Sequence, residues 1–214
     1  MQFIIDKSQI NSCESKIIHF YCIKNNIKCF YKERSDFVEN AIPIGTVDFV
    51  QNFYGKNFIP NYYPEFLNRF IGRKIWNFSE IPIEECFIKP ADKYKRFEGK
   101  ISSKLVGKER AGPYWCSEIV NFQKEWRVYA ADGEVIASYY YLGEEEEILP
   151  PKINIRFPKS FCGAIDFGLL DSKVELIESH HPFACGWYGG FSEGKKYIDW
   201  IIAGHNFLLA QINK

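Results

Sequence analysis

A strong hairpin signal lies near the middle of the chain and constrains its fold more than any other feature. The dipeptide Asp132-Gly133 separates two alternating runs, residues 125–131 and 134–142. Both turn positions of a two-residue hairpin need positive φ, which Asp and Gly tolerate. From Lys74 onward the apolar residues follow strand spacing. We therefore expect antiparallel sheet here, with further strands at residues 74–78, 86–89 and 115–122.

The first 57 residues are predicted to form a small α/β lobe. Apolar runs at residues 3–5 and 27–31 predict strands. Asn11 and Glu14 are spaced as a capping box, in which each side chain satisfies a backbone donor at a helix start. Thr46 is placed to cap a second helix.

The rest of the chain, residues 58–214, is predicted to form a larger domain. Residues 55–64 have the composition of a linker, and Pro64 suits the start of a short helix that ends at Phe70. The acidic stretch at 144–147, followed by two prolines, predicts a solvated loop. An apolar stripe over residues 195–213 predicts a C-terminal helix that covers the sheet.

Composition and charge exclude several classes of protein. Lys and Arg total 27 and Asp and Glu total 27, so the zero net charge predicts no nucleic-acid partner. The sequence contains no apolar run of about 18 residues, so no membrane partner is predicted. Residues 1–7 lack a secretion pattern. The seven cysteines form no C-x-x-C pair, which suits a reduced, cytoplasmic protein.

A second predicted hairpin, residues 163–179, brings two carboxylates together. With a loop at residues 171–173, Asp166 lies opposite Glu178 on one face of the sheet, and His180 shares that face. Like charges directly opposite one another are destabilising, so we expect a divalent cation, Mg²⁺ in particular, to compensate. If the register differs by one residue, each carboxylate is simply solvated.

Two basic residues extend this candidate site. Pro90 keeps Lys89 extended at a strand end, where the ammonium group either binds a phosphate or lies in water. Arg127 shares a strand face with Glu125, and the central hairpin turn places Ser138 opposite Arg127. The planar guanidinium suits a phosphate or carboxylate, and an exposed ion pair is the alternative.

Two further segments leave their chemistry open. The basic stretch 91–100 suits a mobile lid over a polyphosphate, or a solvated turn. His180, His181 and Cys185 are close in sequence, and Cys162 lies on the partner strand. They could form a zinc site or a thiol–histidine pair, but their spacing matches no standard zinc pattern and buried thiols are common.

The order of these pieces resembles that of ATP-grasp proteins. The motifs that carry the resemblance are F-I-K-P-A-D-K-Y-K-R-F-E-G, S-E-I-V, E-W-R-V-Y-A-A-D-G, G-A-I-D-F-G and I-E-S-H. They fall within residues 58–190 and are most similar to a small clade of predicted amide-bond ligases, known mainly from phage and bacterial genomes. The resemblance implies an α+β, ATP-grasp-like fold of mostly antiparallel sheets flanked by helices, with a reduced N-terminal α/β lobe.

The resemblance also implies roles for single residues. ATP would lie between segments 74–122 and 123–190, bound by Lys89, Lys95, Gly99, Glu118, Ile119, Val120 and Glu125. Arg127 and Lys95 would act on the phosphate or the acyl substrate. Asp166, Glu178 and His180 would bind Mg²⁺, although the family usually has asparagine where His180 stands.

The implied reaction joins a carboxylate and an amine, either small molecules or peptides, at the expense of ATP. The carboxylate attacks the γ-phosphate to give an acyl phosphate, from which the amine displaces phosphate, with residues 187–190 lining the acceptor side. Metal ions neutralise the developing charge. The alternatives are a nucleotide-binding or sensing protein without turnover, such as a phage accessory factor, a ligase with a covalent lysine–nucleotide, and a core protein without a ligand.

Overall fold

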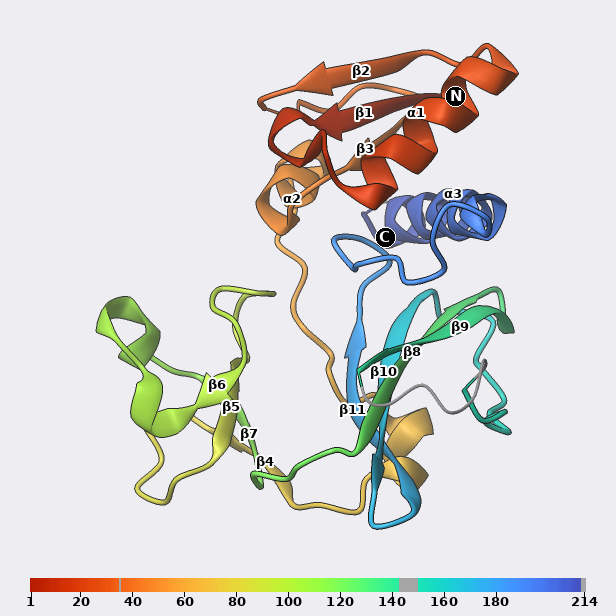
Figure 1. The fold of residues 1–214 in the computed structure, drawn as a ribbon. Coiled ribbons are helices and arrows are strands. Elements are labelled where there is room, and N and C mark those ends of the chain that lie inside the picture. The colour runs from red at the N-terminus through yellow and green to blue at the C-terminus, as the bar shows by residue number, and fades with distance from the viewer. Residues whose placement is uncertain (35, 143–149, 213–214) are drawn as a thin grey trace.

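The computed structural model describes residues 1–34, 36–142 and 150–212. These residues form one parallel and two antiparallel sheets, so the fold is α+β. Figure 1 shows the N-terminal lobe above the two antiparallel sheets, which stand side by side. The loop predicted at 144–147 lies outside the described residues. In the part of the chain that is described, no helix is long and apolar enough to cross a membrane.

The N-terminal lobe is a three-stranded parallel sheet with two helices. Its strands follow the order β2-β1-β3. The elements are β1 (Gln2–Asp6), η1 (Lys7–Gln9), α1 (Cys13–Asn25), β2 (Cys29–Lys32), β3 (Ala41–Ile44) and α2 (Val47–Tyr54). Thr46 caps α2 as predicted, because its hydroxyl accepts a hydrogen bond from the Phe49 amide.

The predicted capping box of α1 is wrong. Ser12, not Asn11, is the N-cap, and its hydroxyl accepts from the Ser15 amide at 3.1 Å. The Glu14 carboxylate instead accepts from the Trp187 amide at 2.7 Å, so tertiary contact overrides the local pattern. The lobe is thereby joined to the segment that follows the last strand.

The second sheet follows a short 3₁₀ helix that starts beside Pro64. Its strands are antiparallel in the order β4-β7-β5-β6. The elements are η2 (Glu65–Phe70), β4 (Ile75–Phe78), β5 (Phe87–Pro90), β6 (Lys100–Ile101), η3 (Ser102–Lys104), η4 (Gly107–Arg110) and β7 (Tyr114–Ser117). The strand predicted at 115–122 is too long, because β4 begins at Ile75 and offers β7 no partner beyond Ser117.

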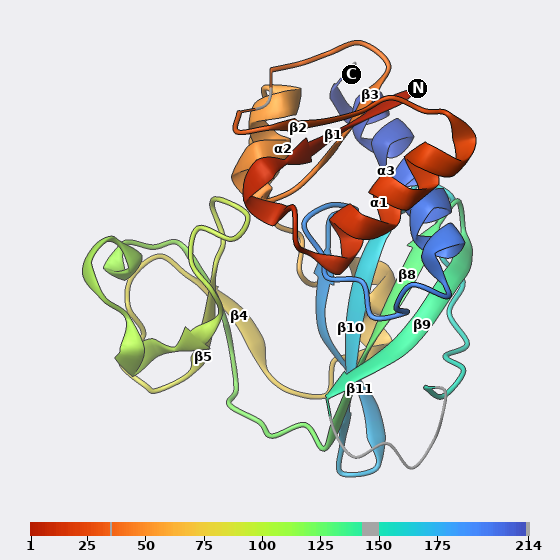
Figure 2. The ribbon, with the colours of Figure 1, turned by 45° about the horizontal axis from the view of Figure 1, so that its top comes forward.

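The third sheet contains both predicted hairpins. Its order is β11-β10-β8-β9, and every neighbouring pair is antiparallel. The strands are β8 (Lys124–Ala131), β9 (Glu134–Leu142), β10 (Gly163–Leu170) and β11 (Lys173–His180). The C-terminal helix α3 (Gly194–Ile212) packs on β8 and β9 with one side and on α1 with the other, as Figure 2 shows. It therefore covers the sheet, as predicted.

The central hairpin has the predicted turn and an unpredicted register. Asp132 and Gly133 both have positive φ, at 53° and 87°. An extra residue in β9, Ile136, then shifts the pairing by one. Tyr139 consequently lies opposite Arg127, and Ser138 lies opposite Val128 instead.

The second hairpin shows the reverse. Its predicted three-residue loop is wrong, because Leu170 pairs with Lys173 across the two-residue turn Asp171-Ser172. A β-bulge at Ile177 then shifts the register by one residue, so Asp166 does lie opposite Glu178.

Candidate active site

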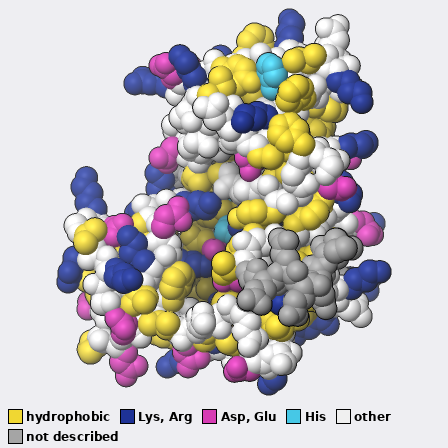
Figure 3. Space-filling model, in the orientation of Figure 1, with side chains coloured by type: hydrophobic (Ala, Val, Ile, Leu, Met, Phe, Trp, Pro, Cys, Tyr) yellow, Lys and Arg dark blue, Asp and Glu magenta, His cyan; other side chains and the backbone are white. Residues whose placement is uncertain are grey.

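Charged side chains from both antiparallel sheets meet in a hollow between those sheets. Figure 3 shows this hollow, with side chains of both signs on its floor. Arg127 on β8 donates two hydrogen bonds to Asp166 on β10, at 2.6 and 2.7 Å. Lys89 on β5 reaches across from the other sheet to Glu178 on β11, with Nζ 2.8 Å from Oε2. The predicted repulsion between the two acids is therefore balanced by the protein's own cations.

Burial and ion pairing act against each other on these groups. Burial alone would raise the pKa of Asp166, which is 3% exposed, but the Arg127 guanidinium outweighs it and holds that pKa well below its usual value. Burial likewise opposes the charged forms of Glu178 and Lys89, yet their mutual attraction lowers the pKa of Glu178 and raises that of Lys89. All four groups are therefore charged near neutral pH.

His180 completes the buried cluster. Its Nε2 lies 3.0 Å from Asp166 Oδ2, and its Nδ1 lies 3.0 Å from the hydroxyl of Tyr94. A neutral ring with the proton on Nε2 satisfies both contacts, donating to the carboxylate and accepting from the tyrosine. Tyr94 was not singled out in the sequence, and it is 1% exposed.

The cluster has donor atoms that fit a divalent cation. One ligand atom each from Asp166, Glu178 and His180 lie within 4.8 Å of one another. Two carboxylates are the hard oxygen ligands that Mg²⁺ prefers, whereas imidazole favours softer metals. Because Arg127 binds both oxygens of Asp166, a cation at this carboxylate must share it with the guanidinium or displace one of its hydrogen bonds.

Comparison with known proteins identifies the domain. A family model described as an ATP-grasp domain, the second family of its clade, matches residues 66–198. The chain belongs to this family. The residues Lys89, Arg127, Asp166, Glu178 and His180 all fall inside the matched range, and the N-terminal lobe precedes it. No curated protein matches the sequence.

Solved structures share the ATP-grasp fold at low identity. A RimK domain protein of the ATP-grasp type from Sphaerobacter thermophilus superposes with a TM-score of 0.56 at 6% identity, covering 94% of this chain and 100% of that one. D-alanine–D-alanine ligase from Bacillus anthracis gives a TM-score of 0.51 at 10% identity, covering 96% and 98%. At such identities the likeness concerns the fold alone.

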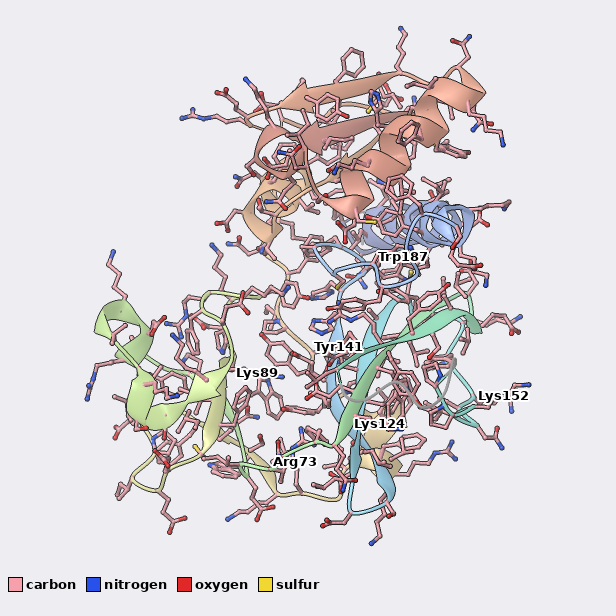
Figure 4. All side chains as sticks on the ribbon, viewed as in Figure 1. Arg73, Lys89, Lys124, Tyr141, Lys152 and Trp187 are labelled. Carbon is pink, nitrogen blue, oxygen red and sulfur yellow. The ribbon has the colours of Figure 1, made fainter. Side chains whose placement is uncertain are left out.

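Several predicted nucleotide contacts of the ATP-grasp domain lie around the cluster rather than in it. Gly99 packs against Lys89, since a Cβ at this glycine would lie 3.3 Å from Lys89 Cε. Glu125 sits on β8 two residues before Arg127 and hydrogen-bonds to Tyr141. Figure 4 shows Lys89 and Tyr141 on opposite sides of the hollow.

The predicted hinge residues lie in the connection between the two sheets. Glu118, Ile119 and Val120 follow the end of β7 and belong to no strand. Glu118 is anchored there, because its carboxylate accepts from the Lys74 amide at 2.9 Å. Ile119 is 47% exposed, so this backbone is open to a ligand.

Lys95 points away from the acidic pair, toward the N-terminal lobe. Its ammonium group donates to the Ala184 carbonyl at 3.0 Å. It lines a cavity of about 410 Å³ that Ser12, Thr46 and Gly186 also border. The cavity thus joins the lobe, the 93–99 loop and the segment after β11.

The predicted acceptor wall at residues 187–190 is only partly exposed. Trp187 is 5% exposed and packs in the core between β8 and α3, where Figure 4 labels it. Tyr188 is 42% exposed, stacks on Tyr141 at 4.9 Å and lies 5.2 Å from the Arg127 guanidinium. Nothing in the sequence signalled this pair of stacked tyrosines.

The cysteines do not form the zinc or thiol site considered above. The Cys185 thiol donates to the backbone carbonyls of His181 and Phe183, and burial raises its pKa. The His181 ring contacts the Ile59 carbonyl. Among the described residues, only the Asp166 cluster has metal-ligand spacing.

Proposed function

We propose that this protein is an ATP-dependent carboxylate–amine ligase that activates its acid as an acyl phosphate with Mg²⁺. The observation that carries the proposal is the pairing of Asp166 and Glu178 on one hairpin, with Lys89 reaching them from the facing sheet. A phosphate between the sheets would then meet an ammonium group on one side and carboxylates that can hold its metal on the other. The ATP-grasp family supports this arrangement.

The residues have distinct parts in this proposal. Lys89 would exchange its Glu178 partner for a phosphate oxygen, and Glu178 and Asp166 would hold Mg²⁺. The metal would supply charge neutralisation at the phosphate transferred. Arg127, held in place by Asp166, would face the acyl group with its remaining donor, which points to the Gly186 carbonyl at 3.4 Å.

The cavity beside Lys95 is the proposed entrance for the acid or amine. Its lining mixes hydroxyl groups with charges of both signs, including Glu98 and Asp48. Such a lining suits a small zwitterionic molecule or the end of a peptide, whose charges need partners on burial. Lys95 would there bind a substrate carboxylate.

A product assay tests the proposal. The protein is incubated with ATP, Mg²⁺ and pooled amino acids and peptides, and the products are examined by mass spectrometry. ADP with a mass-shifted amide is expected. ATP binding without turnover supports the sensing alternative, and a protein–nucleotide adduct with pyrophosphate supports the covalent one.

Substitution of the lysine adds a matched test. Lys89→Met should weaken ATP binding, measured by calorimetry, in a protein that still melts cooperatively. Ser138→Ala, on the same sheet as the acidic pair but outside the cluster, should bind ATP like the wild type. Equal ATP affinity in Lys89→Met and the wild type would refute the role of Lys89.

A further inference from the structure

The outer edge of β11 is held by an arginine from outside the sheet. β11 is an edge strand, so one side of its backbone has no strand partner among the described residues. Arg73, which lies between η2 and β4, donates from Nη1 to the Leu176 carbonyl at 2.6 Å and from Nη2 to the Ile177 carbonyl at 3.1 Å. Figure 4 labels this residue where the two antiparallel sheets are joined.

These two carbonyls flank the bulge that brings the acidic pair together. Phe167 pairs with Leu176, and Asp166 pairs with Glu178, so Ile177 is the extra residue. Regular pairing from the turn would place Ile177 opposite Asp166 and Glu178 opposite Ile165. A slip of one residue moves a side chain to the other face, which here is the apolar side of the sheet.

A close fit fixes the position of the guanidinium. Arg73 is 8% exposed, and the buried carboxylate of Glu175 lies 3.7 Å from its Nη1. A Cβ on Gly72 would lie 2.1 Å from Glu175 Oε1, so the chain passes this carboxylate at a distance that only glycine permits. The planar fork of Arg73 can satisfy two neighbouring carbonyls at once, which a single ammonium group cannot do.

We propose that Arg73 is a positioning residue for the metal site: it clamps the bulge at Ile177 and so keeps the Glu178 carboxylate beside Asp166. The inference rests on the proposed function for the metal itself. Arg73 contacts the backbone of β11 and acts on the metal only through Glu178.

The first test uses Arg73→Lys, which keeps the charge beside Glu175 and loses the fork. Binding of Mn²⁺ to the ADP-saturated protein is followed by electron paramagnetic resonance. Because residues that orient metal ligands affect metal affinity about 10–100-fold, we expect Mn²⁺ to bind weaker by this factor. ADP affinity in EDTA should stay unchanged. Undiminished Mn²⁺ affinity in the folded variant overturns the proposal.

Arg69→Lys is the matched control. Arg69 lies four residues earlier, is exposed and also donates to a backbone carbonyl, that of Asn154. It should bind Mn²⁺ like the wild type. If it loses Mn²⁺ affinity as Arg73→Lys does, the effect is a general one of this segment and the specific role of Arg73 is refuted.

A second variant and a structure keep the test decisive. If Arg73→Lys does not fold, Arg73→Met with Glu175→Met removes both charges of the buried pair, an exchange that is often neutral for stability. Wild-type protein that binds no Mn²⁺ with ADP would refute the proposed function. The crystal structure of the variant then decides the role of Arg73: a shifted Ile177 supports it, and Glu178 still paired with Lys89 overturns it.

Discussion

The two hairpins of the third sheet reach their registers by opposite routes. In β8–β9 the turn at Asp132-Gly133 agrees with the sequence pattern, and a bulge at Ile136 then displaces every later pair by one. In β10–β11 the turn is one residue shorter than expected, and a bulge at Ile177 restores the pair of Asp166 and Glu178. The comparison teaches that bulges, and not turns, decide which side chains face each other at the site.

The difference also separates the two hairpins electrostatically. Near its bulge, β10–β11 carries a buried network of acids paired with Arg127 and Lys89. The corresponding part of β9 has the hydroxyl of Ser138, which is buried and has no hydrogen-bond partner among the described residues. Charge therefore constrains one hairpin and packing the other.

The largest effect is expected from breaking the charged hairpin. Asp166→Ala leaves Arg127 buried without its carboxylate, which should lower the free energy of unfolding by about 3–5 kcal/mol. Ser138→Ala on the other hairpin removes a hydroxyl without a partner and should change stability by less than about 0.5 kcal/mol. Urea unfolding measures both, and similar losses in the two variants would contradict the contrast.

Acid should weaken the charged hairpin selectively. The pKa of Asp166 is lower in the folded protein than the unfolded value of about 3.9, so its stabilisation is complete above that pH and is lost as pH falls toward the folded value. We expect the urea midpoint of the wild type to fall below about pH 4. Asp166→Ala should show a shallower fall, and parallel profiles would argue against the pairing.

The opposite sign is expected for the carboxylate on β8. Burial raises the pKa of Glu125, so ionisation opposes folding as pH rises above the unfolded value of about 4.3. Glu125→Gln should therefore be more stable than the wild type at pH 7 and equal to it near pH 3. A variant that is less stable at pH 7 would show that the contact with Tyr141 needs the charge.

The smallest effect concerns the turns themselves. Ser172 has a φ of 64°, a left-handed conformation that costs a non-glycine residue about 1 kcal/mol, so Ser172→Gly should stabilise by that amount. Gly133 has a φ of 87° with only ordinary contacts around it, and Gly133→Ser should destabilise similarly. Neither change should alter Mg²⁺–ATP binding, because the turns lie away from the bulges.

The sequence predicted local features better than distant ones. Turn residues and alternation located the hairpins, and the order of motifs led to the family. The bulges were missed because Ile136 and Ile177 are apolar like their neighbours, so the pattern carries no mark of an extra residue. Tyr94 and Arg73 were missed because their partners lie 86 and 103 residues away.

The contact between Lys89 and Glu178 makes ligand entry an exchange of partners rather than a simple addition. A phosphate that takes the ammonium group releases a carboxylate, and a cation that takes the carboxylate replaces the charge just lost. Each arrival prepares the place for the other, so anion and metal should bind better together than separately. The two sheets, tied by this one bridge, would be tied afterwards by the ligand itself.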